Sequence, residues 1–357
     1  MMSTHAHVYR DGLARVVSRL RSSAFAVLSG AILGGALLAA ISAARANDST
    51  AELSLGGLQF APTSDIALKS EDLRISLDRI AVRYQLVNTA AKPVTLTVTF
   101  PLPDIDLSDA DSLALPSTDP VNFVDFETRI DGAPAPFRID QRAMLGDKDV
   151  GALLDQFKLP VLPVGRREIR LDDLPEATRT RLVDQGLLMP ERTDERGRQH
   201  YAMAWVAKTS ALRQQTFPPG GEVIVEHQYR PSVGISSDTI LRRFLRNNTA
   251  LSAEVERYRK EYCISDAFLA QLDARTGAGE PNASMVGEQR INYALKRGTD
   301  EAAPIGSFRL TIDPGAGDRL VSFCPGRLKP AAPDALTFTA KDFTPEGDLK
   351  ILIIGRF

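Results

Sequence analysis

Four aspartates in one short stretch come nearest to a metal site: Asp104, Asp106, Asp109 and Asp111. Carboxylates two residues apart can both reach a calcium ion. The stretch lacks the glycine and the terminal glutamate of an EF-hand loop, and prolines stand on both sides of it. We therefore expect a polar loop without a bound metal, and a calcium site is the alternative.

His227 is the histidine best placed to act as a base or a ligand. It alternates with Val223, Val225 and Tyr229, so it should face the core of a strand-based domain. A histidine there usually has a structural role, and the alternative is a general base or a ligand in a cleft at the sandwich edge. Beyond residue 46 the only other histidine is His200, in a polar run expected to be exposed, which excludes a three-histidine metal site within one subunit.

Motifs for nucleophilic, zinc-protease and phosphate chemistry are absent from the sequence, including G-x-S-x-G, S-x-x-K, H-E-x-x-H and G-x-x-x-x-G-K. Neighbouring carboxylates such as Glu71 and Asp72 should lie on opposite faces of a strand, unlike a glycosidase pair. Trp205 and Tyr201 could form a binding patch, although core packing is the plainer interpretation. The sequence therefore assigns no catalytic residue and implies no cofactor.

The first 46 residues have the pattern of an export signal. Four arginines precede residue 22, residues 22–44 carry no charge, and Ala44-Arg45-Ala46 follows. A basic start, an apolar run and a small-x-small end are typical of a secretory signal peptide. We expect cleavage between Ala46 and Asn47, a periplasmic location and no stable membrane insertion afterwards. The alternative is a retained anchor, because an uncharged run of this length can span a bilayer.

Removal of this segment leaves a mildly acidic chain. The whole chain has 43 basic and 45 acidic residues, and residues 1–46 contain five basic and one acidic residue. The remainder has 38 basic and 44 acidic residues, a net charge of −6. Such a chain lacks the basic surface on which nucleic-acid affinity depends, so we expect no nucleic-acid partner.

Two cysteines, Cys263 and Cys324, lie in the exported part. Cysteines in an oxidising compartment usually pair, so we expect a disulfide bond between them. It would close a loop of about 60 residues and stabilise the fold by roughly 4 kcal/mol in the chain-entropy model. Two separate buried thiols are the alternative.

Strand patterns dominate the chain beyond residue 46. Apolar and polar residues alternate at 80–86 and 94–100, which predicts two strands that we expect to pair as a hairpin. Further strands are expected at 123–130, 201–206 and 222–229. A helix is predicted from the spacing of four apolar residues, with Asp147 as its cap; they are Val150, Leu153, Leu154 and Phe157.

These patterns predict a mainly β protein. We expect an immunoglobulin-like β-sandwich domain at 47–235 with a helical insertion at about 144–200. A helical connector and loop should follow at 236–288, where Ser265 is placed to cap a helix. A second, smaller β-sandwich domain is expected at 289–357.

Short motifs spread over the chain beyond residue 46 resemble one family. They are, in order, 47–51 (NDSTA), 56–58 (GGL), 70–73 (SEDL), 100–105 (FPLPDI), 120–123 (PVNF), 225–229 (VEHQY), 262–263 (YC), 304–306 (PIG), Cys324 and 348–350 (DLK). The chain resembles the bacterial family catalogued as domain of unknown function 4424. The resemblance implies an exported envelope protein in which both cysteines belong to the family pattern. It implies no activity and no catalytic residues.

A fainter resemblance covers residues 75–140 and 216–231. Phe-Pro-Leu-Pro after a strand, the Ile130-Asp131-Gly132 turn and the Pro-Gly-Gly before the next strand are similar to the vault protein inter-alpha-trypsin domain. That resemblance implies an immunoglobulin-like sandwich, and the insertion at 144–200 departs from it. A shared fold says nothing about activity.

The sequence favours a non-catalytic envelope module that binds another envelope protein or a cell-wall component. A hydrolase is the first alternative, and it requires His227, nearby carboxylates and the loop of Asp104 to Asp111 to converge in one pocket. A binder of a small ligand, held between the two β domains by Trp205 and Tyr201, is the second.

Overall fold

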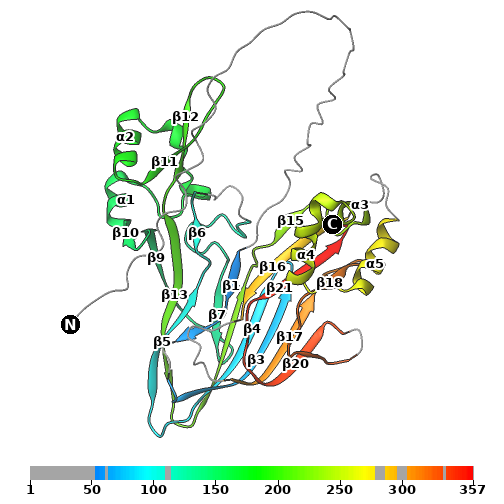
Figure 1. Cartoon of the computed structure of the whole chain (residues 1–357). Helices are drawn as coiled ribbons and strands as arrows, with labels where there is room; N and C mark the ends of the chain where they lie inside the picture. Colours follow the sequence, from blue (N-terminus) through cyan, green and yellow to red (C-terminus); the bar gives the residue numbers. More distant parts are fainter. Residues whose placement is uncertain are drawn as a thin grey trace, which may run out of the picture. The chain divides into compact units, whose positions relative to one another are not determined.

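β-Sheets dominate the computed structural model of the chain, as the sequence predicts (Figure 1). The structure describes residues 53–60, 63–108, 114–277, 286–295, 304–332 and 335–356. Residues 46–357 form one compact unit. The expected signal segment 1–46 lies outside the described residues, as do Asp109 and Asp111.

The largest sheet in the described residues has eight strands, in the order β19-β20-β17-β3-β4-β14-β7-β8. Their bounds are β3 (Ile66–Ser76), β4 (Ile80–Asn88), β7 (Glu127–Ile130), β8 (Ala133–Pro134), β14 (Glu222–Tyr229), β17 (Ile305–Asp313), β19 (Lys329–Pro330) and β20 (Thr337–Phe343). β17 runs parallel to β3, and its other neighbour β20 is antiparallel. β17 and β3 come close at Gly306, where a Cβ atom would lie 2.7 Å from the Lys69 carbonyl oxygen.

A second described sheet has six strands, with β10-β9-β13-β5-β2 in order and β6 paired to β13. Their bounds are β2 (Gln59–Phe60), β5 (Val94–Pro101), β6 (Ile105–Asp106), β9 (Arg138–Leu145), β10 (Lys148–Asp149) and β13 (Val206–Phe217). Its inner face packs on the eight-stranded sheet, where the rings of Phe100 and Tyr229 lie 5.0 Å apart. Buried Asn88 joins the sheets by donating from Nδ2 to the Phe217 carbonyl oxygen at 2.9 Å.

A third described sheet has five strands and is covered on both faces. Its strands are β1 (Ser54–Gly56), β15 (Gly234–Ser236), β16 (Gly287–Ala294), β18 (Leu320–Ser322) and β21 (Leu349–Gly355). In β21, Ile351 and Ile353 enter the main core, whereas Leu352 and Ile354 enter a second apolar cluster with the helices. A strand buried on both faces reads as a continuous apolar run, as residues 351–354 do.

Helices pack on the outer side of this third sheet (Figure 1). They are α3 (Arg243–Arg246), the 3₁₀ turn η4 (Thr249–Leu251), α4 (Ser252–Glu261) and α5 (Asp266–Thr276). Ser265 caps α5, as predicted, by accepting a hydrogen bond from the Phe268 N–H at 3.1 Å. In the described part of the chain, no helix has the length and apolar character needed to cross a membrane.

The segment between the paired strands β9 and β13 contains the expected helices. They are α1 (Gly151–Phe157) and α2 (Glu176–Asp184), with the 3₁₀ turns η2 (Gly165–Arg167) and η3 (Leu171–Asp173) and the hairpin β11 (Leu188–Thr193) and β12 (Gln199–Met203). The expected cap of the first helix is wrong. Asp149, not Asp147, accepts from the Gly151 N–H at 2.9 Å, because α1 begins after Val150.

The expected hairpin of residues 80–86 and 94–100 is also wrong. β4 pairs with β3 and β14 in the eight-stranded sheet, whereas β5 pairs with β13 and β2 in the six-stranded sheet. The two strands therefore face each other across the core. Alternation shows that a strand has one apolar face, and it does not distinguish a neighbour in the sheet from a partner across the core.

The C-terminal strands do not form a sheet of their own, in contrast to the separate domain expected at 289–357. β17 pairs with β3, and β16 pairs with β1, so strands from both ends of the chain share two sheets. Both contacts are parallel. Parallel neighbours need a long crossover, so sequence proximity gives no sign of them.

The predicted disulfide bond between Cys263 and Cys324 is confirmed. Cys263 follows α4, and Cys324 lies two residues after β18, so the bond holds the helices to the third sheet. Two polar contacts support the same junction. The Ser322 hydroxyl donates to the Tyr262 carbonyl oxygen at 2.9 Å, and Lys350 Nζ lies 2.6 Å from Glu261 Oε1.

We predict that the double variant Cys263→Ala, Cys324→Ala unfolds more easily than the natural chain. The bond closes a loop with a sequence separation of 61, and its loss should lower the free energy of unfolding by about 4 kcal/mol. Urea unfolding of both proteins measures this difference. The single variant Cys324→Ala should lose the same amount, because either change opens the loop. An unchanged urea midpoint in both variants would refute the structural role of the bond.

Candidate functional site

The acidic loop does not assemble into a metal site in the described residues. Asp104 forms an ion pair with Lys208 Nζ at 2.8 Å, and this pair raises the pKa of Lys208. Asp106 accepts hydrogen bonds from the Ser108 N–H at 2.9 Å and its hydroxyl at 2.7 Å. No group of three or more His, Cys, Asp or Glu side chains that could hold a metal occurs in the part of the chain that the structure describes.

His227 faces the core, as predicted, with 4% of its surface exposed. Its ring meets those of Tyr84, Phe100 and Phe126 edge-on, at centroid distances of 5.7, 5.4 and 5.0 Å. Burial in this aromatic cage, together with the positive charge of Arg213, lowers the pKa of His227 to about 3. The imidazole is therefore neutral at any physiological pH.

Trp205 is fully buried and donates from Nε1 to the Val161 carbonyl oxygen at 2.9 Å. It packs in the main core, and the half-buried Tyr201 packs against the same core. The core interpretation of Trp205 is thus confirmed, and this side chain presents no surface to a ligand. His200, expected to be exposed, lies instead between two carboxylates, 3.2 Å from Asp172 and 3.4 Å from Asp194.

The convergence that a hydrolase would require does not occur in the described residues. His227 lines two cavities, and neither of them includes Asp104 or Asp106. Asp104 is 53% exposed and forms its ion pair with Lys208 on β13 of the six-stranded sheet. His227 belongs to β14 of the eight-stranded sheet. The acidic loop and the histidine therefore do not form one reactive site.

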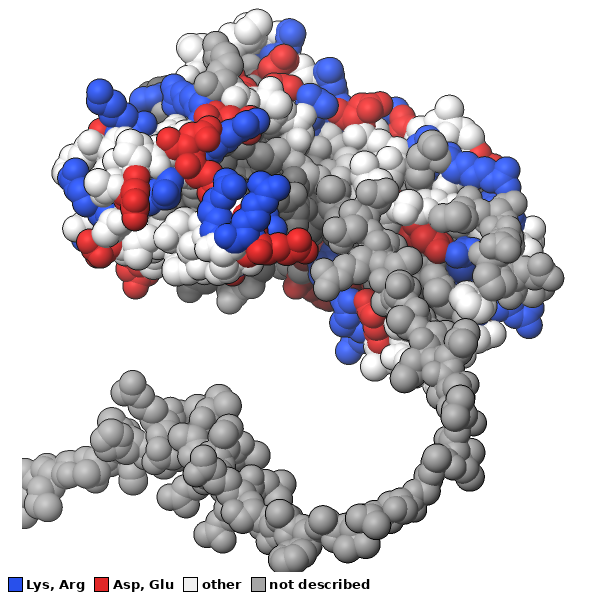
Figure 2. All heavy atoms as spheres, turned by 90° about the horizontal axis from the view of Figure 1, so that it is seen from above, with Lys and Arg blue, Asp and Glu red and all other residues white. Residues whose placement is uncertain are grey.

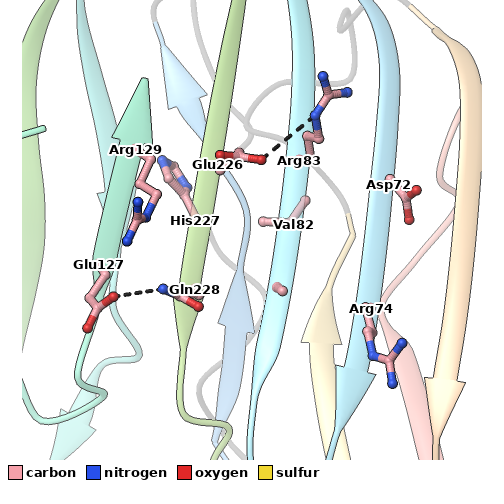
Figure 3. A pocket seen from close by; sticks show the side chains of 10 residues that line it. Asp72, Arg74, Val82, Arg83, Glu127, Arg129, Glu226, His227 and Gln228 are labelled. Carbon is pink, nitrogen blue, oxygen red and sulfur yellow. Dashed lines mark hydrogen bonds and ion pairs between the residues drawn. The ribbon is translucent and has the colours of Figure 1, made fainter. Parts of the chain in front are cut away.

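The outer face of the eight-stranded sheet carries a row of alternating charges instead. The register places five charged residues side by side on five neighbouring strands, in the order Arg129, Glu226, Arg83, Asp72 and Arg309. They come from β7, β14, β4, β3 and β17. We call these five residues the charge row. Figure 3 shows Arg83 and Glu226 pointing toward one another from β4 and β14, with 3.8 Å between Nε and Oε1.

A hollow lies beside the charge row. The neighbouring row reads Glu127, Gln228, Ala81 and Arg74 in register, and the short side chain of Ala81 leaves room between its long neighbours. The resulting open cavity has a volume of about 330 Å³. It is bordered by Asp72, Arg74, Arg83, Glu127, Arg129, Glu226 and Gln228 (Figure 3). Both signs of charge and an amide therefore surround one concave surface.

The ion pairs of this face are open to solvent. Arg83 and Glu226 are 50% and 38% exposed, and Arg309 and Asp72, 3.9 Å apart, are 58% and 56% exposed. Exposed pairs of this kind contribute about 0–1 kcal/mol to stability. The fold therefore gains little from the charge row, and its side chains are free to exchange their partners for those of a bound molecule.

Charges of both signs are also mixed elsewhere on the surface. Figure 2 shows one face of the molecule, on which basic and acidic side chains of the described residues lie interspersed. A basic stripe of the kind that follows a nucleic-acid backbone is not visible on this face. The order of charges in the eight-stranded sheet is set by strand register.

The sequence did not single out the charge row because each strand contributes one member. Alternation correctly put Arg83 on the outer side of its strand, and Glu71 and Asp72 do lie on opposite faces, with Glu71 3% exposed. The order in which β7, β14, β4, β3 and β17 stand together depends on pairings far apart in the chain. Only a correct sheet order could have placed the five charges in one line.

Comparisons with known proteins give a family and a likeness to solved structures. The family model described as Domain of unknown function (DUF4424) matches residues 46–352. A solved structure from Legionella pneumophila, of a candidate nutrient binding protein, is similar with a TM-score of 0.43 and 13% identity, over 86% of this chain and 72% of that chain. No curated protein matches the sequence.

We predict that His227 makes stability depend on pH in a defined window. The pKa of His227 is about 3 in the folded chain and about 6.5 in an unfolded chain. Between these values the unfolded state binds one more proton, so the free energy of unfolding should rise with pH by up to about 1.4 kcal/mol per unit. This stability is complete above pH 6.5 and is lost toward pH 3.

Urea unfolding at pH 4, 5, 6 and 7, of the natural chain and of His227→Gln, measures this contribution. The glutamine is polar and does not titrate, so its curve should be flatter across the window. Carboxylates contribute equally to both curves, and the difference isolates the histidine. Parallel curves for the two proteins would show that His227 binds a proton in the folded state.

Proposed function

The chain belongs to the DUF4424 family, and we propose that it is an exported, non-catalytic binding module that docks another envelope protein on the charge row. The observation that carries the proposal is the in-register alternation of five exposed charges beside a hollow of about 330 Å³. The proposal has two parts, export and docking, and each has its own test.

Two observations support export. The disulfide bond between Cys263 and Cys324 is typical of proteins that mature in an oxidising compartment. The family model begins at residue 46, where the sequence pattern predicts the end of a signal peptide. The proposed mature chain therefore begins at Asn47 and stays in the periplasm.

We predict that the protein recovered from a periplasmic extract has Asn47 as its first residue. Intact-mass measurement of the full-length gene product, expressed in a Gram-negative host, tests this directly. The variant Ala44→Asp, Ala46→Asp should remain uncleaved, because a signal peptidase requires small residues at these positions. A mature mass that still contains the Ala46-Asn47 bond would favour a retained anchor.

The chemistry of the charge row defines the partner. Strands lie about 4.8 Å apart, so like charges in the row recur about every 9.6 Å. The row has three arginines and two acids, so a complementary surface carries carboxylates opposite Arg129, Arg83 and Arg309 and basic groups between them. Charge complementarity of this kind fixes register and speeds association more than it adds affinity. We therefore expect a folded envelope protein with an acid-rich, mixed-charge patch, bound weakly at high salt.

We predict that exchanging one pair of charges abolishes docking without harming the fold. In the variant Arg83→Glu, Glu226→Arg the net charge is kept, but the centre of the row is inverted. Partners cross-linked to the tagged mature protein in envelope extract should be lost from the variant by at least tenfold, as read by mass spectrometry. The urea midpoint should change little, because exposed pairs contribute only about 0–1 kcal/mol.

The matched control exchanges a pair on the other sheet, with Asp104→Lys and Lys208→Asp. This pair is equally exposed, at 53% and 51%, and should keep the partner. A captured protein counts only if the first exchange loses it, the control keeps it, and the purified protein binds in a salt-dependent way. Equal capture by both variants, or retention on isolated cell wall alone, would refute docking of a protein on the charge row.

A further inference from the structure

An arginine points into the core from the middle of β13. Residues with odd numbers on this strand face inward, and Ala207, Ala211 and Phe217 among them are buried. Arg213 belongs to the same series and lines a small cavity between the two large sheets. Burial lowers the pKa of Arg213, but a guanidinium remains charged at any physiological pH. Two of its nitrogen atoms, Nε and Nη1, are buried between the sheets, whereas the residue as a whole is half-buried.

Two side chains of the opposite sheet line the same cavity. Thr128 and His227 stand opposite each other in the pairing of β7 with β14, and they are 6% and 4% exposed. The hydroxyl of Thr128 and Nδ1 of His227 are both buried without a hydrogen-bond partner. The same holds for Nε and Nη1 of Arg213. Four unpartnered polar atoms thus belong to three residues that line one cavity.

The rest of the cavity wall supplies neither a countercharge nor a hydrogen-bonding side chain. The other described residues around it are Leu58, Val98, Phe100, Phe126, Phe137, Ala211 and Leu212. Unpaired buried donors cost about 1–3 kcal/mol each. The described wall supplies no hydrogen-bond acceptor side chain for Nε and Nη1 of Arg213 other than Thr128 and His227, which do not bond to them. Buried polar atoms without hydrogen-bond partners are rare in native proteins, so a cluster of them needs a specific explanation.

We propose that Arg213, Thr128 and His227 form a binding site for a small monovalent anion, either a halide or the carboxylate group of a small organic acid. Arg213 supplies the charge and two N–H donors, and the Thr128 hydroxyl donates a third hydrogen bond. The neutral ring of His227 donates from Nδ1 when the proton resides on that nitrogen. The low-dielectric surroundings strengthen each of these contacts.

The size of the space limits the ligand. The cavity measures about 10 Å³, which is room for about one group of the size of a water molecule. Chloride or one carboxylate oxygen meets this limit, whereas sulfate does not. Phe137, which is half-buried and follows β8, forms part of the wall. The carbon chain of a longer acid would therefore extend from the cavity past this side chain toward solvent. This site lies on the inner face of the eight-stranded sheet and the charge row on its outer face, and His227 lines the cavities on both sides.

Thermal unfolding in different anions tests the site. The mature protein is titrated with formate, acetate, propionate or chloride against sulfate at constant ionic strength. A ligand that binds only the folded state raises the unfolding temperature with the logarithm of its concentration. We expect such a rise for formate or chloride and a saturable shift of the Arg213 Nε–H resonance in nitrogen-15 spectra. A larger rise for acetate and propionate than for chloride identifies the organic acid as the ligand.

Three variants separate binding from folding. Arg213→Met removes the charge at similar length, so it should abolish the anion effect and raise the unfolding temperature without ligand. Thr128→Val keeps the shape of the side chain and should weaken the anion effect at least tenfold in concentration. Arg142→Met removes an arginine that is 62% exposed on the same six-stranded sheet and should leave the effect unchanged.

The proposal is overturned if the natural chain shows neither an anion-specific rise in unfolding temperature nor a shift of the Arg213 resonance. It is also overturned if Arg213→Met keeps the anion effect or if this variant is less stable without ligand, because the arginine would then be a structural residue. The resonance of Arg213 and the Thr128→Val variant decide the matter if Arg213→Met does not fold.

Discussion

The parallel pairing of β3 with β17 is the constraint on which the rest of the structure depends. It joins residues 66–76 to residues 305–313 in one continuous register from Ser70 opposite Ser307 to Ser76 opposite Asp313. Without this contact the eight-stranded sheet would divide into β19-β20-β17 and β3-β4-β14-β7-β8. The charge row would then lose Arg309. The entropic cost of closing a loop rises only slowly with its length, so the distance between these strands in the sequence costs little additional stability. Contacts between such distant segments nevertheless slow folding.

The same constraint explains which parts of the fold the sequence could predict. The alternation at 80–86 and 222–229 predicts β4 and β14, Ser265 predicts the start of α5, and two cysteines in an exported chain predict the disulfide bond. Each of these signals is local or depends on a count. The pairing of β4 with β14, and of β3 with β17, depends on contacts between distant segments, for which the sequence has no local sign.

β3 shows how a local pattern can also be hidden. The register shifts between Leu68 and Ser70, which marks a bulge, and the buried positions change from even to odd numbers there. The residues that face inward are therefore Ile66 and Leu68 before the bulge and Leu73 and Ile75 after it. Buried Glu71 breaks the apolar pattern further. A strand of 11 residues that carries Asp72, a member of the charge row, thus has no clear alternation.

Polar side chains have different energetic roles on the inner and outer faces of the sheets. On the outer face, the pairs are exposed and their loss costs little, so the order of charges is free to serve recognition. In the core, Asn88, Tyr84 and Trp205 each have a hydrogen-bond partner, and burial raises the pKa of Tyr84 to about 12. Gly57 makes one of these contacts possible, since a Cβ atom there would lie 2.5 Å from the Tyr84 hydroxyl.

The cluster of Arg213, Thr128 and His227 departs from this rule. Other buried side chains of the described residues also leave single atoms unpaired, for example Gln215 Oε1. An isolated free atom of this kind is an ordinary cost of folding, whereas four free atoms of three residues around one cavity are a local concentration. Stability alone would favour an apolar side chain at position 213. A charge kept there against that preference is best explained by a bound group that supplies the missing partner.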